Sequence, residues 1–332
     1  MYRIRVVSDP EECHRLWDAV IPREFISDLW EVRACFDGFY RHAPCFVVAE
    51  EQGQVRGLLP LSLNGDSGLF NYFPGETWSG KTWLEQNRIV IDNPRLLTEM
   101  LAAVPGPYHL RYLRPYSRAG EVYSQVDEIG YLFCPPKYGF DMERYFEEFS
   151  HKTAKKLKRE LASWEERGVT WRFDDPDDFE AMIDLNLGRY GQSSYFYDDR
   201  FTKSFRALRD LLRERGWLRV VTIVVDGVPA AVDLGCVYNG TLTMLAGGTS
   251  GRHVGIAKLI NVHHMTWACE QKLDRVDFLC GDFNWKEMFH LTPVPLYLLH
   301  EARPAARPES GLVHSRTVWS QRGLDAGGAA NA

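Results

Sequence analysis

The sequence lacks the features that mark membrane, secreted or nucleic-acid-binding proteins. No hydrophobic run in the 332 residues approaches the length of a membrane span. Met1 is followed by the polar stretch YRIRVVSDPEE, which has no apolar core of a signal peptide. The net charge of −6 argues against general nucleic-acid binding, DNA included. We therefore expect a soluble, cytoplasmic protein without a membrane span.

Cysteine is present but not in a pattern that implies chemistry. The chain has 7 cysteines, an odd number, and none forms a C-x-x-C pair. Some lie in apolar runs, as in the FLC that ends at Cys280, where a thiol acts as a small hydrophobic group. This usage indicates a reducing compartment, and it excludes a disulfide framework and offers no zinc or other metal site.

What the sequence does contain is an alternation of helical and strand patterns. A strong helix prediction covers residues 150–167, which Gly168 ends, and another covers residues 201–215, which Gly216 ends. Residues 218–248 predict a three-stranded meander with hairpin turns at Asp226-Gly227 and Asn239-Gly240. The first half predicts a helix over residues 10–20, two strands around Gly53, and a helix that begins near Pro94.

One stretch imitates a nucleotide-binding loop. GETWSGKT, Gly75 to Thr82, satisfies the pattern G-x-x-x-x-G-K-[ST]. That loop works only where a buried strand ends at the first glycine and a helix of several turns begins at the lysine. Here only WLEQN separates Thr82 from the strand-like RIVID, which leaves no room for the helix. We therefore interpret the stretch as a surface or substrate-facing loop and reject an ATP or GTP site.

A second stretch combines glycine with a strand-to-helix junction. TSGRHVGIAKLI, Thr249 to Ile260, follows a predicted strand and begins a predicted helix. Free amides of Gly255, Ile256, Ala257 and Lys258 would converge there, with the helix dipole and Arg252 favouring an anion such as a diphosphate. The alternative is that Gly255 merely permits a tight turn, and local physics leaves the two interpretations equal.

Three segments give the sequence a family resemblance. SHKTAKKLKRELASWEERGV (150–169), SSYFYDDRFTKSFRALRDLLRERGWLRV (193–220) and DFLCGDFNWKEMF (277–289), together with the Arg252-x-x-Gly255-x-Ala257 loop, resemble the GNAT acyltransferases. The match is closer to the two-domain branch associated with cellulose or peptidoglycan biosynthesis, which is related to the Fem aminoacyltransferases. It covers residues 141–302 well, whereas the first half fits only in the order of its elements.

The resemblance implies an α/β (α+β) fold with two tandem GNAT-like domains, whose mixed and mostly antiparallel sheets are flanked by helices. We expect a first domain at 1–140 without a donor loop, an acyltransferase domain at 141–303, and a disordered tail at 304–332. The implied activity is transfer of an acyl group from acyl-coenzyme A to a small-molecule or carrier-linked amine, without a metal. In this family the loop binds the donor pyrophosphate, which assigns the donor site to Arg252, His253, Val254, Gly255, Ile256, Ala257 and Lys258.

Two other functions stay open. A Fem-type transfer from aminoacyl-tRNA is possible, although the acidic net charge disfavours tRNA as a partner. The strand before the donor loop, residues 242–248, carries no carboxylate, although many GNAT proteins have a glutamate there that acts as the general base. The absence favours a catalytically degenerate pair of domains that acts as a binding module.

Three residues are candidates for the missing chemistry. Asp233 interrupts the apolar AAVDLGC and is either a base or a solvent-facing strand residue. Asp282 is a second candidate base in GDFNWK. By resemblance to the Fem proteins, Lys286 of the same motif would stabilise the oxyanion, although it could equally be a surface lysine.

The candidate substrate residues are Tyr195, Tyr197 and Lys152. The two tyrosines belong to the aromatic stretch SSYFYDD, which either forms a wall of the acceptor site or packs between the halves. Lys152 begins a basic face on the helix at 150–167 that is either solvated or binds a polyanionic acceptor. We interpret His263 and His264, in the middle of a predicted helix, as structural.

Overall fold

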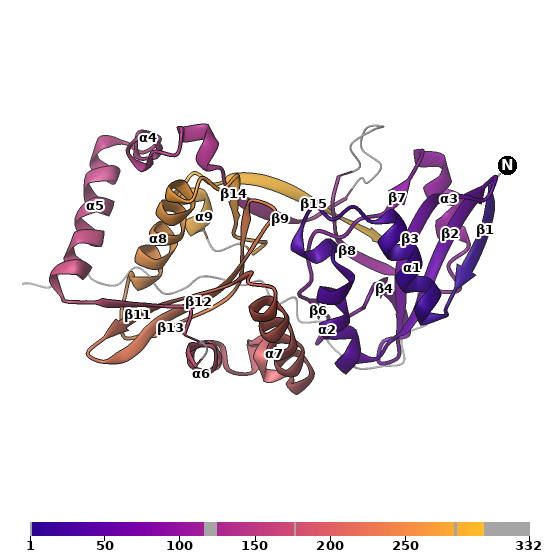
Figure 1. Cartoon of the computed structure of the whole chain (residues 1–332), viewed down its shortest axis with the longest axis horizontal. Coiled ribbons are helices and arrows are strands. Elements are labelled where there is room, and N and C mark those ends of the chain that lie inside the picture. The colour runs from indigo at the N-terminus through magenta and orange to yellow at the C-terminus, as the bar shows by residue number, and fades with distance from the viewer. Residues whose placement is uncertain (1, 116–124, 176, 282–283, 302–332) are drawn as a thin grey trace, which may run out of the picture. The chain divides into compact units, whose positions relative to one another are not determined.

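The computed structural model describes residues 2–115, 125–175, 177–281 and 284–301, which form two main sheets with helices packed against them (Figure 1). This mixed architecture of mostly antiparallel sheets and flanking helices confirms the predicted fold class. The predicted tail, residues 304–332, lies outside the described residues.

The first sheet has strand order β1-β2-β3-β4, and β7 also pairs with β3. Its strands are β1 (Arg3–Val7), β2 (Ala43–Glu51), β3 (Gln54–Asn64), β4 (Leu69–Tyr72) and β7 (Val90–Ile91). Helices α1 (Pro10–Val20) and α3 (Pro94–Ala102) bury Trp17 and Met100 in the same core as the β2 and β3 side chains. The predicted helix starts at Pro10 and near Pro94 are confirmed, and Asp9 and Asn93 cap the two helices.

The second sheet has strand order β10-β11-β12-β13-β14-β9-β15-β8. Its strands are β8 (His109–Leu113), β9 (Gln125–Phe133), β10 (Thr170–Phe173), β11 (Leu218–Val225), β12 (Val228–Tyr238), β13 (Thr241–Thr249), β14 (Arg275–Asp277) and β15 (Thr292–His300). All neighbours are antiparallel except β13 and β14, which are parallel. The predicted turns are confirmed, because Asp226-Gly227 and Asn239-Gly240 have the positive φ angles of tight hairpins.

Helices cover both faces of β11–β13 (Figure 1). On one face lie α6 (Asp178–Tyr190) and α7 (Asp199–Glu214), whose core also contains α2 (Trp30–Tyr40) of the first half. On the other face lie α5 (His151–Glu166) and α8 (Ile256–Glu270). The shorter helices are η1 (Ile26–Asp28), η2 (Pro135–Tyr138), α4 (Met142–Phe146), η3 (Gly191–Ser193), η4 (Tyr195–Tyr197) and α9 (Trp285–Met288).

The sheet and the core both cross residue 140. Strands β8 and β9 precede that position yet pair with β15, and β9 also pairs with β14. Phe36 of α2 packs with Phe201 and Phe205 of α7. A domain boundary at 140 remains a prediction, and any division there would leave β9 on the second half's sheet.

The stretch that imitates a nucleotide-binding loop is a hairpin. Residues 77–78 and 81–82 pair as β5 (Thr77–Trp78) and β6 (Lys81–Thr82), and no helix begins at Lys81 or within residues 83–93. The Lys81 ammonium donates to the Ser193 carbonyl at 2.9 Å and lies over the Trp78 ring. The rejection of a phosphate loop is therefore confirmed.

No helix within the described ranges is both long enough and apolar enough to cross a membrane. The seven cysteines are all free thiols.

The shared core of α2 and α7 gives a direct test of how the halves depend on each other. Phe205 is fully buried and contacts Phe36, Trp83 and Phe179. We expect Phe205→Ala to lower the free energy of unfolding by about 3–5 kcal/mol, because it leaves a cavity among rigid rings. The matched change Lys203→Ala removes only an exposed pair with Asp199 on the same helix and should cost about 0.5 kcal/mol or less. Urea unfolding curves measure both, and equal midpoints would contradict this packing.

Candidate functional site

The second sheet parts between β13 and β14. The two strands pair only from Thr241↔Arg275 to Thr243↔Asp277, whereas β13 continues to Thr249. Beyond Asp277 the chain turns to β9, because the Phe278 amide donates to the Tyr131 carbonyl at 2.9 Å. Among the residues that the structure describes, the β14 side of residues 244–249 therefore has no strand partner. We call the opening between residues 244–249 and 278–280 the wedge.

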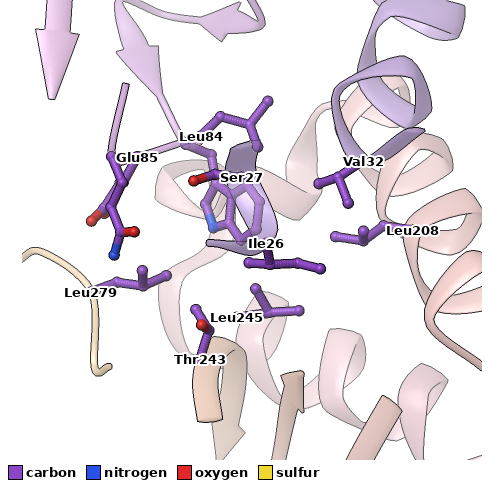
Figure 2. Close-up of a pocket in the computed structure, with 11 residues that line it drawn as sticks. Ile26, Ser27, Val32, Leu84, Glu85, Leu208, Thr243, Leu245 and Leu279 are labelled. Carbon is purple, nitrogen blue, oxygen red and sulfur yellow. The ribbon is translucent and has the colours of Figure 1, made fainter. Parts of the chain in front are cut away.

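A small cavity lies at the closed end of the wedge (Figure 2). Its lining includes Thr243 and Leu245 of β13, and Figure 2 shows Glu85 and Leu279 at one end with Val32 and Leu208 at the other. The cavity volume of about 20 Å³ is room for about one water molecule. A bound acyl group would therefore have to displace side chains here.

Glu85 supplies a carboxylate to the wedge, and it comes from the first half of the chain. Its Oε2 atom accepts a hydrogen bond from the Cys280 amide at 2.8 Å. Burial, opposed by the hydrogen bonding of Cys280 and reinforced by the negative charge of Asp277, raises the Glu85 pKa to about 7. A carboxylate with a pKa near neutrality can both accept and release a proton at physiological pH. The sequence analysis missed this residue.

Glu76 holds the segment that carries Glu85. Its Oε1 atom accepts the amides of Trp83 at 3.2 Å and Leu84 at 2.7 Å. The side chain is almost fully buried, and burial raises its pKa to about 7. The buried Glu76 carboxylate thus connects the two ends of the hairpin of residues 77–82, and Glu85 is the residue after Leu84.

Lys286 is buried and organises the wedge. Its ammonium donates to the carbonyls of Phe278, Leu279 and Cys280 at 2.9, 2.8 and 2.7 Å. Burial lowers its pKa, with nearby carboxylates opposing that effect. The interpretation as a surface lysine is therefore wrong, since the side chain is 3% exposed. The predicted oxyanion role is not tested, but these three bonds give the residue a structural task.

Asp277 stabilises the same turn from its other side. The Leu279 amide donates to Asp277 Oδ1 at 2.9 Å, and Gln86 Nε2 donates to Asp277 Oδ2. Burial raises the pKa of Asp277. Together with Lys286, this carboxylate fixes the turn that presents the Cys280 amide to Glu85. The predicted base Asp282 lies outside the described residues.

The donor loop begins α8 with Gly255 at φ +89°, a left-handed conformation that favours glycine. The Ile256 and Lys258 amides donate to the His253 and Gly255 carbonyls at 3.2 and 3.0 Å. The expectation of open amides is therefore wrong for these two residues, which close a tight first turn. Within the described chain the amides of Val254, Gly255 and Ala257 donate to no carbonyl or side chain.

The loop's side chains divide between solvent and α5. Arg252 and Val254 are exposed. The Lys258 ammonium pairs with Glu160 Oε2 of α5 at 2.7 Å, and the His253 ring packs edge-on against Trp164. Helix α5 therefore supports the donor loop through its contacts with Lys258 and His253.

Asp233 has a buried histidine partner. Its Oδ2 atom lies 3.1 Å from Nε2 of His264, which is 1% exposed, whereas the His264 Nδ1 atom has no partner among the described residues. The solvent-facing interpretation of Asp233 is thus wrong, because the side chain lies between β12, Gly247 and α8. Its role as a base remains a prediction.

The predicted substrate residues do not gather at one place. The Oη atom of Tyr195 donates to the Thr82 carbonyl at 3.1 Å, close to the segment that carries Glu85. Burial, and after it the negative charge of Glu85, raises the pKa of this hydroxyl. Tyr197 is 55% exposed and its ring packs near Trp78. Lys152 is exposed on α5, which covers the opposite face of the sheet from η4 and α7.

Comparison with known proteins agrees with this geometry. Residues 151–287 match the family model described as an acetyltransferase (GNAT) domain. None of the curated proteins matches the sequence.

Solved structures show the fold of the whole described chain. FemX is 12% identical with a TM-score of 0.56, over 88% of this chain and 95% of that one. L-PGS from Bacillus licheniformis is 12% identical with a TM-score of 0.51, over 91% and 94%. A conserved protein of unknown function from Bacteroides thetaiotaomicron is 12% identical with a TM-score of 0.56, over 90% and 99%. The chain thus has the fold of these solved structures, and its residues 151–287 are similar to the acetyltransferase (GNAT) domain.

The raised pKa of Glu85 predicts a pH-dependent stability. Because the folded pKa of about 7 exceeds the ordinary 4.5, folding favours the protonated carboxyl, so this residue's contribution falls as pH rises from about 4.5 to 7. Glu85→Gln keeps an acceptor for the Cys280 amide and removes the charge. We compare the difference in unfolding free energy between this variant and the wild type at two pH values. We expect this difference to favour the variant by about 2 kcal/mol more at pH 8 than at pH 5. The exposed change Glu99→Gln should leave the profile unchanged in urea titrations, and parallel profiles for Glu85→Gln and wild type would refute the assignment.

Proposed function

We propose that this chain transfers an acyl group from acyl-coenzyme A to a small-molecule or carrier-linked amine. The observation that carries the proposal is the set of open amides at Val254, Gly255 and Ala257, where the 15-residue helix α8 begins. Unpaired amides and the positive end of the helix dipole favour a diphosphate there. The GNAT domain match at residues 151–287 supports coenzyme A as the donor.

The wedge supports a path for the rest of the donor. Among the described residues the main-chain groups on the β14 side of residues 244–249 have no strand partner. The Gly247 carbonyl accepts from Asn186 Nδ2 at 2.7 Å, so the other groups of this edge would hold an extended pantetheine arm. An amide on this strand would polarise the thioester carbonyl, since a fixed donor stabilises negative charge that develops on the oxygen. The cavity at the closed end would then receive the acyl group after side chains shift.

Glu85 is the general base in this proposal. Attack by an amine on a thioester requires loss of an ammonium proton, and a carboxylate with a pKa near 7 accepts it efficiently. The residue lines the cavity and is held by the Cys280 amide, so it would lie on the acceptor side of the donor strand. This supplies from the first half the carboxylate that β13 lacks.

A Fem-type transfer from aminoacyl-tRNA is the second candidate. Its supporting observation is the exposed face of α5, which presents Lys152, Lys155, Lys156 and Arg159. The nearby Lys158 and Lys258 are already paired with Glu143 and Glu160. Lys156 also lies 3.9 Å from Glu160, so three cations of that face, Lys152, Lys155 and Arg159, have no acidic partner among the described residues and would favour a polyanion such as tRNA.

Coenzyme A binding tests the donor assignment. We expect calorimetry to show binding to the wild type, and at least a 100-fold weaker affinity for Gly255→Val, since a branched side chain at φ +89° distorts the loop.

Gly251→Val is the matched control, because Gly251 lies in the same loop with an unstrained φ and open space around its Cα. It should bind coenzyme A within threefold of the wild type. Absence of binding to the wild type would remove the acyl-coenzyme A proposal, and RNase-sensitive transfer from charged tRNA would then establish the second candidate. Loss of both activities would favour a binding module.

The role of Glu85 is tested by thiol release from acetyl-coenzyme A against a panel of primary amines. For any amine that is accepted, we expect Glu85→Gln to lower kcat about 10²- to 10⁴-fold while coenzyme A affinity stays within threefold. The rise of the wild-type rate with pH through about 7 should also disappear in the variant. An unchanged pH profile would exclude Glu85 as the base.

A further inference from the structure

Three arginine side chains converge on one phenyl ring at the start of β14. The guanidinium carbon atoms of Arg114, Arg88 and Arg275 lie 3.9, 5.2 and 5.4 Å from the centroid of the Phe25 ring. They come from three separate segments of the chain, since Arg88 precedes β7, Arg114 follows β8, and Arg275 begins β14. We call these three side chains the arginine cluster.

The cluster has more positive charge than its partners neutralise. Arg88 donates from Nε to Asp28 at 2.9 Å and from Nη2 to Glu24 at 2.5 Å. Asp28 also accepts the amides of Glu24 and Phe25. Glu24 and Asp28, the two carboxylates closest to the cluster, are therefore already bound to Arg88, whereas Asp277 acts on Arg114 only through its charge.

Two of the three guanidinium groups are left with unused donors. In the described part of the chain the side chains of Arg114 and Arg275 donate no hydrogen bond, and Arg114 Nη1 approaches Glu24 only to 4.0 Å. That Nη1 atom is also buried. Burial, together with repulsion from Arg88, lowers the pKa of Arg114 to about 10. Such unused donors are the expected state of a site that awaits an oxyanion.

The cluster is adjacent to the wedge. Arg275 and Asp277 point to the same side of β14, about 6.6 Å apart along the strand, since two residues of a strand span that length. Gln86, two residues before Arg88 in the chain, donates to Asp277. An anionic group held by the arginines would thus lie about two strand residues from Asp277, which is close to Glu85.

We propose that the arginine cluster binds an anionic oxygen group, a phosphate or a carboxylate, of the acceptor substrate. The role as an acceptor subsite rests on the proposed transferase function, whereas the anion site itself does not. A guanidinium group binds a tetrahedral or planar oxyanion through its fork of N–H donors, and all three guanidinium groups lie around the Phe25 ring.

The test uses the ¹⁵N-arginine-labelled full chain and its side-chain Nε–Hε resonances. Arg114→Gln and Arg275→Gln assign two of the signals by their loss. On titration with inorganic phosphate at constant ionic strength, the signals of Arg114 and Arg275 should shift and saturate in the millimolar range. Arg23, which is exposed and paired with Asp18, is the control and should shift by less than a tenth as much.

A parallel titration with acetate distinguishes the two sources of the oxyanion. Saturation with phosphate alone assigns a phosphate-bearing acceptor, and saturation with acetate assigns a carboxylate. Arg275→Gln should weaken binding of the effective anion at least 10-fold, read from the Arg114 signal. Shifts that grow linearly and equally at Arg23, or no shifts at all, would overturn the proposal. Coenzyme A calorimetry reports separately on the donor loop, so the transferase proposal can fail while this anion site stands.

Discussion

One buried ammonium group keeps the second sheet open. Lys286 donates to three consecutive carbonyls, those of residues 278–280, and this arrangement is incompatible with a continued β14, in which successive carbonyls point to opposite neighbours. The positive φ of Leu279 and the Asp277 side chain, which accepts the Leu279 amide, turn the chain to β9 instead. A buried cation is costly unless such carbonyls and nearby carboxylates compensate it. The wedge, the position of the Cys280 amide and the hydrogen bond to Glu85 all depend on this one arrangement.

Both halves of the chain contribute residues to the candidate site, and the two halves of the chain share a core. Glu76 fixes residues 83 and 84, α2 packs on α7, and Glu85 reaches the turn after β14. A carboxylate on a separate layer can approach the donor strand from its open side, whereas a carboxylate on β13 itself would have to share the strand with the donor. The absence of an acid from residues 242–248 is therefore compatible with catalysis, and it weakens the argument for a degenerate binding module.

The sequence predicted features that depend on local chemistry and missed those that depend on distant contacts. Asp226-Gly227 and Asn239-Gly240 require left-handed backbone, so the hairpins could be recognised from dipeptides alone. GETWSGKT could be rejected because too few residues follow it to form a helix. Glu85 lies in WLEQN, which has no periodicity, and its importance arises from a bond to an amide 195 residues away. Lys286 could be recognised from its motif, but its burial could not be predicted. The carbonyls that bind its ammonium become available only where β14 separates from β13.

The two proposed anion sites lie at opposite ends of the parted strands. Arg275 pairs with Thr241 at the start of β13, and the donor loop follows Thr249 at its end. Eight residues of extended strand separate these points by about 26 Å. One small phosphate group cannot occupy both places, so two different charged groups would be needed to fill them. The wedge and Glu85 lie between the two ends, which is the position where an acyl group and an amine must meet if each substrate is anchored by its own charged end.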